Sequence, residues 1–142
     1  MKHITIKFTG FLLLVVLLLM ATSDLIYAAN DDIPRVSIEE LKRMMDDGAD
    51  VVILDTQPRS TYDRGHIMGA LSLPWVPELK DTDVQWLSKQ KLIITYCDCG
   101  PGENDSADLA SQLIDLGFAN VKVLADPSIR GWKKVGYPIG NK

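Results

Sequence analysis

The chain has 142 residues and a formal net charge of −4 at pH 7. This length favours one compact domain. The charged residues form no basic patch and no run of like charge, so nucleic acid is excluded as an expected partner.

The N-terminal segment differs from the rest of the chain. Lys2 and Lys7 precede the apolar run 11–21, and small residues follow that run. This pattern predicts a signal peptide at residues 1–29. The alternative is an uncleaved membrane anchor, although the apolar run is shorter than the ~20 residues that a membrane span needs. We therefore expect residues 30–142 to form an exported domain, in the periplasm or another extracytoplasmic space, that meets a membrane only if the leader is uncleaved.

A helix is the first element expected after the leader. Ser37 and Glu40 form a capping box, which predicts that a helix begins at this point. Apolar residues at helical spacing follow, and Gly48 is a stop signal. The pattern predicts a helix over residues 36–50.

Later segments alternate between short apolar runs, typical of buried parallel strands, and amphipathic stretches, which favour helices. In chain order they are strands at 51–55 and 71–74, a helix at 82–90, a strand at 91–96, a helix at 106–118, a strand at 120–124 and a helical turn around Trp132. This alternation predicts an α/β fold with a small central parallel sheet flanked by helices on both faces.

Both cysteines of the chain, Cys97 and Cys99, follow the strand predicted at 91–96. Ligands of parallel sheets bind at the carboxyl ends of strands, which is where Cys97 falls. A Cys-x-Cys disulfide closes almost no loop, so stabilisation of the fold explains this pair poorly. With His66 as the only histidine after the leader, we expect no metal site within one chain.

The segment after Cys97 has the features of an anion-binding loop. Its residues are Asp98, Cys99, Gly100, Pro101, Gly102, Glu103, Asn104, Asp105 and Ser106. The glycines let successive backbone N–H groups turn inward, and a helix expected to begin near Ser106, capped by Asn104 or Asp105, adds its positive end. Such a loop stabilises a nucleophilic thiolate. A buried structural cysteine that only ends a strand would explain the same residues, and the loop alone leaves both interpretations open.

Four segments resemble the rhodanese-homology domain, in the order in which that family has them. They are LDTQPRSTYDRGHIMGALSLP, LIITYC, LIDLGFANVKVL and GWKKVGYPI, and the resemblance spans residues 36–139. It implies the rhodanese-like fold and a sulfurtransferase without metal or organic cofactor. The resemblance implies that Cys97 takes a sulfane sulfur from a small donor and holds it as a persulfide. It would then pass this sulfur to a thiol acceptor, either a small molecule or a protein.

The loop departs from the family pattern in its charge. It is longer than the usual rhodanese loop, contains no basic residue, and carries the acids Asp98, Glu103 and Asp105. Acidic side chains oppose anionic donors such as thiosulfate. Arg130 is the nearest candidate to supply the lost positive charge.

Three further residues are candidates for the pocket. In the family pattern an arginine stands two residues after the residue that matches Asp55, and Gln57 takes its place here. Arg59 follows closely enough to be a substitute. The resemblance implies a largely structural role for His66, with a catalytic role as the alternative.

Cys99 is the second departure from the family. Its thiolate could attack a Cys97 persulfide, releasing sulfide and leaving a Cys97–Cys99 disulfide that the short spacing makes labile. Cys99 could equally be a loop residue without a chemical role. Three functions therefore stay open: a sulfurtransferase that uses Cys97, a thiol–disulfide redox protein that uses both cysteines, and a non-catalytic binding module.

Overall fold

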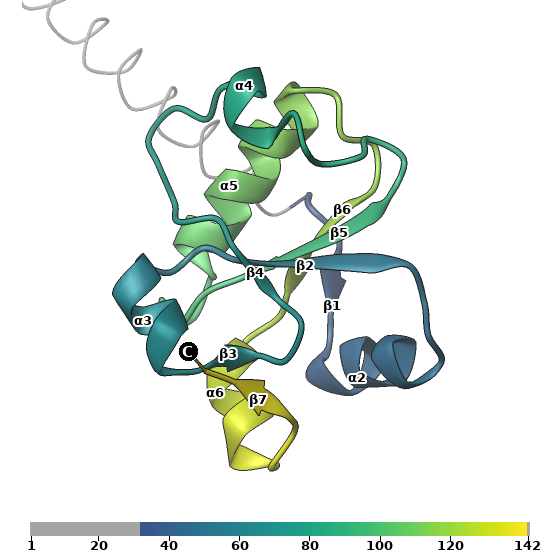
Figure 1. The fold of residues 1–142 in the computed structure, drawn as a ribbon, viewed down its shortest axis with the longest axis vertical. Helices are drawn as coiled ribbons and strands as arrows, with labels where there is room; N and C mark the ends of the chain where they lie inside the picture. The colour runs from purple at the N-terminus through teal and green to yellow at the C-terminus, as the bar shows by residue number, and fades with distance from the viewer. Residues whose placement is uncertain (1–31, 142) are drawn as a thin grey trace, which may run out of the picture. The chain divides into compact units, whose positions relative to one another are not determined.

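The computed structural model describes residues 32–141, so the predicted leader lies outside the described part of the chain. A parallel sheet of five strands in the order β1-β6-β5-β2-β4 forms its centre (Figure 1). The strands are β1 (Arg35–Val36), β2 (Val51–Asp55), β4 (Leu71–Ser72), β5 (Leu92–Tyr96) and β6 (Val121–Leu124). In a second, smaller sheet, β3 (His66–Ile67) pairs antiparallel with β7 (Ile139–Gly140).

Helices cover both faces of the central sheet (Figure 1). They are α2 (Ile38–Asp46), α3 (Arg59–Arg64), α4 (Asp81–Val84), α5 (Asn104–Asp115) and α6 (Ser128–Lys134). Successive side chains of a strand point to opposite faces. In β2, Ile53 therefore packs with α2 and α6, whereas Leu54 packs with α4 and α5. The predicted α/β fold with helices on both faces is confirmed. None of the helices in residues 32–141 is both long and apolar enough to cross a membrane.

Two predicted helices have different limits in the structure. Ser37 caps α2 by accepting a hydrogen bond from the Glu40 backbone N–H at 3.1 Å, as its sequence pattern predicts. The helix begins at Ile38 because Val36 is needed in β1, where it pairs with Leu124 of β6. The helix predicted at 82–90 is reduced to the four residues of α4.

The start of α5 differs from the prediction. The capping residue is Glu103 rather than Asn104 or Asp105, and it has a left-handed backbone with φ of 46°. Its side chain makes no capping hydrogen bond. It cannot do so because the Glu103 carboxylate is used elsewhere, in contacts with Arg35 and with the backbone of Asp126.

The carboxyl ends of β2, β5 and β6 meet at one edge of the sheet, as parallel strands require. The loops that follow these strands bind one another there. Thr56, just after β2, donates from its backbone N–H at 2.9 Å and from Oγ1 at 3.1 Å to the carbonyl of Tyr96. This edge therefore presents the residue that follows Tyr96, which is Cys97.

Candidate active site

Cys97 occupies a fixed position between two neighbouring loops. It follows β5 directly and is only 2% exposed. Its backbone carbonyl accepts a hydrogen bond at 2.9 Å from Oγ of Ser128, which begins α6. The preceding carbonyl, of Tyr96, is held by Thr56 from the other side. Bonds from both flanking loops thus set the direction of the Cys97 side chain.

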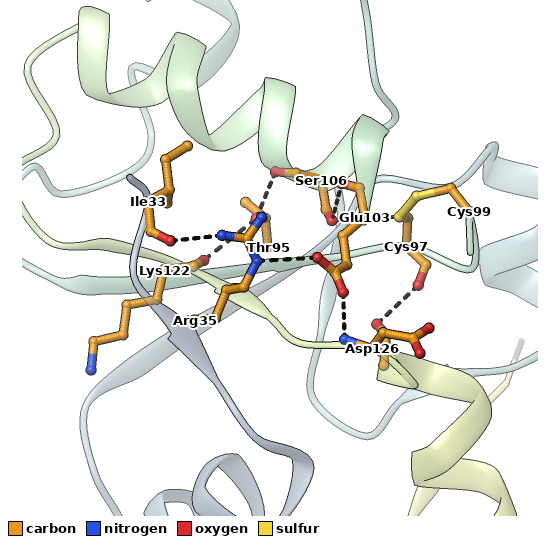
Figure 2. Close-up of polar contacts among 10 residues, drawn as sticks. Ile33, Arg35, Thr95, Cys97, Cys99, Glu103, Ser106, Lys122 and Asp126 are labelled. Carbon is orange, nitrogen blue, oxygen red and sulfur yellow. Dashed lines mark hydrogen bonds and ion pairs between the residues drawn. A yellow bond between two sulfur atoms is a disulfide. The ribbon is translucent and has the colours of Figure 1, made fainter. Parts of the chain in front are cut away.

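The Cys97 sulfur has two neighbours that matter chemically (Figure 2). It forms a disulfide with Cys99, with the Cα atoms 5.4 Å apart. It also lies 3.4 Å from Oγ of Ser106, in the first turn of α5. Ser106 is fully buried, and its hydroxyl donates to the carbonyl of Glu103 at 3.0 Å. Once the disulfide is reduced, a hydroxyl group therefore faces the Cys97 sulfur.

Residues 97–103, hereafter the Cys97 loop, bend back so that α5 begins beside the sulfur. Gly100 and Gly102 have φ of 85° and 93°, values that a residue with a side chain rarely adopts. Among the described residues, the backbone N–H groups of residues 104–106, at the start of α5, have no acceptor, and the first N–H that has one is that of Ala107. The N-terminus of a helix carries such donors together with a partial positive charge. Together with the Ser106 hydroxyl, they form a cradle suited to a thiolate or to an anion bound next to it.

Glu103 does not present its charge to this cradle (Figure 2). It is 4% exposed, and its carboxylate accepts hydrogen bonds from Arg35 Nε at 3.2 Å and from the backbone N–H of Asp126. Glu103 therefore ties the Cys97 loop to β1 and to the segment after β6. An ion pair neutralises its charge, so it opposes an anionic substrate less than the sequence suggested.

Arg130 lies beside the Cys97 loop but is engaged by two acids. Its Nε is 3.0 Å from Oδ1 of Asp98, and its Nη2 is 2.9 Å from Oδ1 of Asp126. The structure thus places Arg130 at the loop, as the sequence predicts. Its positive charge is shared between two carboxylates and is not left unpaired for a donor anion.

Asp55 is fully buried in a hydrogen-bonded network behind β5. It accepts from the Tyr96 hydroxyl at 2.6 Å, and from the backbone and side-chain nitrogens of Gln57 at 2.9 and 3.0 Å. The Tyr96 oxygen in turn accepts from the backbone N–H of Ile67 at 3.0 Å. Burial, and then the nearby Asp55 carboxylate, raise the pKa of Tyr96 well above its usual range. These contacts give Asp55 a structural role.

His66 and Arg59 are held by residues of α3. The His66 ring stacks on Tyr62 with centroids 3.7 Å apart, and its Nδ1 is 2.9 Å from the Tyr62 carbonyl. Arg59 pairs with Asp63 at 2.9 Å and lies over the same tyrosine ring. The Asp55 carboxylate therefore accepts hydrogen bonds from Gln57 and not from Arg59. None of these contacts involves the Cys97 loop.

Three residues of the site were not foreseen from the sequence. Thr56, Ser128 and Arg35 hold the backbone or the side chains around Cys97 from distant parts of the chain. Within residues 32–141, no group of three or more histidine, cysteine or acidic side chains could hold a metal ion.

The family model for the rhodanese-like domain matches residues 37–134. The chain belongs to the rhodanese-like family. The resemblance seen in the sequence motifs is thereby confirmed.

Three proteins illustrate what this chain is similar to in sequence or in structure. The adenylyltransferase and sulfurtransferase UBA4 of Candida albicans is 29% identical over 98 residues, which cover 65% of this chain and 22% of that protein. The chain thus spans about a fifth of this curated relative. The BH2092 protein from Bacillus halodurans has a TM-score of 0.69 and 26% identity, covering 85% of this chain and 86% of that one. The rhodanese-like domain of the Alr3790 protein from Anabaena sp. has a TM-score of 0.66 and 31% identity, covering 77% and 80%.

Proposed function

We propose that this rhodanese-like domain is a sulfurtransferase that carries sulfane sulfur as a persulfide on Cys97. The observation that carries the proposal is the placement of the Cys97 sulfur 3.4 Å from the Ser106 hydroxyl at the start of α5. Membership of the family and the sulfurtransferase relative support the same reaction.

The loading step begins with reduced Cys97. Its thiolate attacks the outer sulfur of a donor persulfide, R–S–SH. A sulfur–sulfur bond forms at Cys97, the donor's sulfur–sulfur bond breaks, and R–S⁻ leaves. The Ser106 hydroxyl and the N–H groups of residues 104–106 stabilise the negative charge on sulfur at both ends of this step.

Persulfides suit this site better than thiosulfate as donors. Thiosulfate carries two negative charges and would approach a loop whose nearest cation, Arg130, already pairs with Asp98 and Asp126. Asp105 adds a further carboxylate at the start of α5. A donor without a sulfonate group avoids this repulsion. We therefore expect slow loading from thiosulfate and faster loading from a small organic persulfide.

A thiol–disulfide redox function is the second candidate, and the Cys97–Cys99 disulfide favours it. The same disulfide can also end a sulfur-transfer cycle. The Cys99 thiolate attacks the inner sulfur of the Cys97 persulfide, the bond to the outer sulfur breaks, and HS⁻ leaves. In either case Cys97 must be reduced again before it can accept sulfur.

Intact-mass spectrometry of the full chain distinguishes these functions. The reduced protein is treated with glutathione persulfide or with thiosulfate, and wild type is compared with Cys97→Ser and Cys99→Ser. A carrier gains the mass of one sulfur atom, loses it to cyanide, and gains nothing as Cys97→Ser. An adduct seen only in Cys99→Ser assigns the resolving role to Cys99. If no adduct forms and mild oxidation removes two hydrogens, the result favours the redox protein. If the mass changes in neither way, the result favours a binding module.

We also propose that the leader at residues 1–29 exports this domain. The basic and apolar pattern of that segment supports export. Disulfides persist in oxidising compartments, so the Cys97–Cys99 bond suits such a location. Cell fractionation with N-terminal sequencing of the mature protein tests the proposal, and an unprocessed cytosolic chain would contradict it.

A further inference from the structure

A small cavity with no assigned occupant lies between the loop after β2 and the start of α5. Its volume is about 240 Å³, and it is lined by Thr56, Pro58, Pro74, Trp75 and Asp105. Two of these residues place it beside the nucleophile. Thr56 donates to the carbonyl of Tyr96, the residue before Cys97, and Asp105 precedes Ser106, whose Oγ is 3.4 Å from the Cys97 sulfur. Cys97 does not itself line the cavity, so transfer from this cavity requires the sulfur carried on Cys97 to extend toward it.

Trp75 forms a fixed wall of the cavity. Its backbone N–H donates to the carbonyl of Thr56 at 2.8 Å, and its indole Nε1 donates to Oδ2 of Asp108 at 2.6 Å. Asp108 lies one turn after Asp105 on α5 and also accepts from Gln112 at 2.8 Å. The single indole N–H is thus already used, although the side chain remains 41% exposed. Trp75 therefore offers a ligand in this cavity its ring and no free donor.

The charge around the cavity is negative. Of the three acids that follow Cys97, Asp98 pairs with Arg130 and Glu103 pairs with Arg35. Asp105 has no hydrogen-bonding or ionic partner among residues 32–141. Arg59, which follows the lining residue Pro58, is held by Asp63. A carboxylate without a cation and an indole ring that line the same cavity are a combination that binds an ammonium group by charge and by cation–π attraction.

We propose that this cavity binds small thiols that carry a primary amine, and that these aminothiols accept the sulfur from Cys97. The inference rests on the proposed sulfurtransferase function and names the class of its acceptor. The size supports it, since about 240 Å³ is below the ~300–1,000 Å³ of sites for drug-sized ligands. The ammonium group lies against Asp105 and Trp75, and the sulfur points toward Cys97.

The transfer step needs no further reagent. The acceptor thiolate attacks the outer sulfur of the Cys97 persulfide, and a new sulfur–sulfur bond forms. The bond between the two sulfurs on Cys97 breaks, and its electron pair remains on Cys97 as a thiolate. The proton of the outer sulfur leaves with the product, an aminothiol persulfide. The thiolate left on Cys97 is the form that the N-terminus of α5 and Ser106 stabilise.

The test compares three acceptors of similar size and different charge. The full chain in a Cys99→Ser background is loaded with sulfur and mixed with cysteamine, 2-mercaptoethanol or 3-mercaptopropionate, and loss of sulfur from Cys97 is followed by mass. Asp105→Asn should slow transfer to cysteamine about 3- to 10-fold, which corresponds to about 0.7–1.4 kcal/mol. It should change transfer to the neutral thiol less than transfer to cysteamine, and it should speed transfer to the anionic thiol. Trp75→Leu should also slow sulfur transfer to cysteamine more than transfer to the other two thiols.

Comparing each thiol with itself across variants removes differences in intrinsic thiol reactivity. Asp115→Asn, which removes an exposed acid at the far end of α5, is the matched control and should change none of the three rates. If Asp105→Asn shifts all three rates equally, Asp105 acts on Cys97 itself and the aminothiol site is overturned, while the sulfurtransferase function stands. If Cys97 never takes up sulfur from any donor, the proposed function fails and the acceptor site fails with it.

Discussion

Arg35 Nε donates to Oε2 of Glu103 at 3.2 Å, although the two residues are 68 positions apart in the sequence (Figure 2). Arg35 lies in β1 at one edge of the sheet, and Glu103 is the last residue before α5. The same carboxylate accepts from the backbone N–H of Asp126. One buried acid thus holds the Cys97 loop against two other segments, and the position of the sulfur depends on it.

Glu103→Ala should therefore weaken both the fold and the site. We expect a loss of about 1–3 kcal/mol in the free energy of unfolding, because two hydrogen bonds to a charged group disappear. Arg35 keeps its hydrogen bond from Nη1 to the carbonyl of Ile33, and its side chain is 28% exposed, which keeps the loss below the ~3–5 kcal/mol of a fully buried pair. Sulfur loading of Cys97 should slow as well. Urea unfolding and intact-mass kinetics measure the two effects.

A surface ion pair supplies the control for Glu103. Lys42 and Asp46 pair at 2.6 Å on α2, and the Asp46 side chain is 61% exposed. Asp46→Asn should lower the free energy of unfolding by no more than about 0.5 kcal/mol and should leave the rate of sulfur loading on Cys97 unchanged. The Glu103→Gln side chain can still accept a hydrogen bond from the Asp126 N–H. Its free energy of unfolding and its loading rate should therefore fall between those of wild type and Glu103→Ala. Loading at the wild-type rate in Glu103→Ala would show that the loop keeps its shape without this contact.

Ser106→Ala should slow the chemistry more than it harms the fold. In the disulfide form the Ser106 proton goes to the carbonyl of Glu103, so rotation of the hydroxyl is enough to redirect it to a Cys97 thiolate. Loss of one hydrogen bond of about 1.4 kcal/mol corresponds to roughly tenfold slower loading. Ser111→Ala on the same helix is the control and should load normally. If both variants load sulfur at the same rate, the Ser106 hydroxyl does not stabilise the Cys97 thiolate.

Local pattern explains which parts of this fold could be predicted. The strand β5 is a continuous apolar run and α5 a regular amphipathic helix, so both were expected within a few residues of their observed limits. The helix α3 was missed, because the six residues RSTYDR have no apolar repeat and only Tyr62 is buried. The strands β3 and β7 have two residues each and exist only through pairing across the chain.

The candidate site divides in the same way. Cys97 was predicted because a strand, two glycines and a helix surround it in sequence, and the family motifs converge on it. The contacts from Arg35 and Ser128 join residues 68 and 31 positions apart, and no local pattern encodes them. The predicted cap of α5 was wrong for a related reason, since a distant arginine determines where the Glu103 side chain points.

His66→Gln should leave sulfur loading within about twofold of wild type and still destabilise the protein. His66 is 8% exposed, and its ring is fixed by stacking on Tyr62 and by a hydrogen bond to the Tyr62 carbonyl. The variant loses the ring stacking and weakens the hydrogen bond to the Tyr62 carbonyl. The free energy of unfolding should therefore fall by about 1–3 kcal/mol. Urea unfolding beside mass-based loading gives both numbers. A large drop in loading with little change in stability would instead make His66 a catalytic residue.

Tyr96→Phe should change how stability depends on pH at the alkaline end. The Tyr96 hydroxyl donates to Asp55 at 2.6 Å and accepts from Ile67, so its loss should cost about 1–3 kcal/mol at pH 8. Burial and the Asp55 charge raise the pKa of Tyr96 in the folded protein above its usual value.

The sign of the pH effect follows from where the proton is held. Below about pH 10, tyrosine is protonated in both the folded and the unfolded chain, and Tyr96 contributes no pH dependence. Above it, only the folded protein keeps the Tyr96 proton, so the free energy of unfolding should fall by up to about 1.4 kcal/mol per pH unit more in wild type than in Tyr96→Phe. The gap between the two proteins should therefore narrow from pH 10 upward in urea unfolding. Parallel slopes would mean that the Asp55–Tyr96 hydrogen bond does not hold this proton.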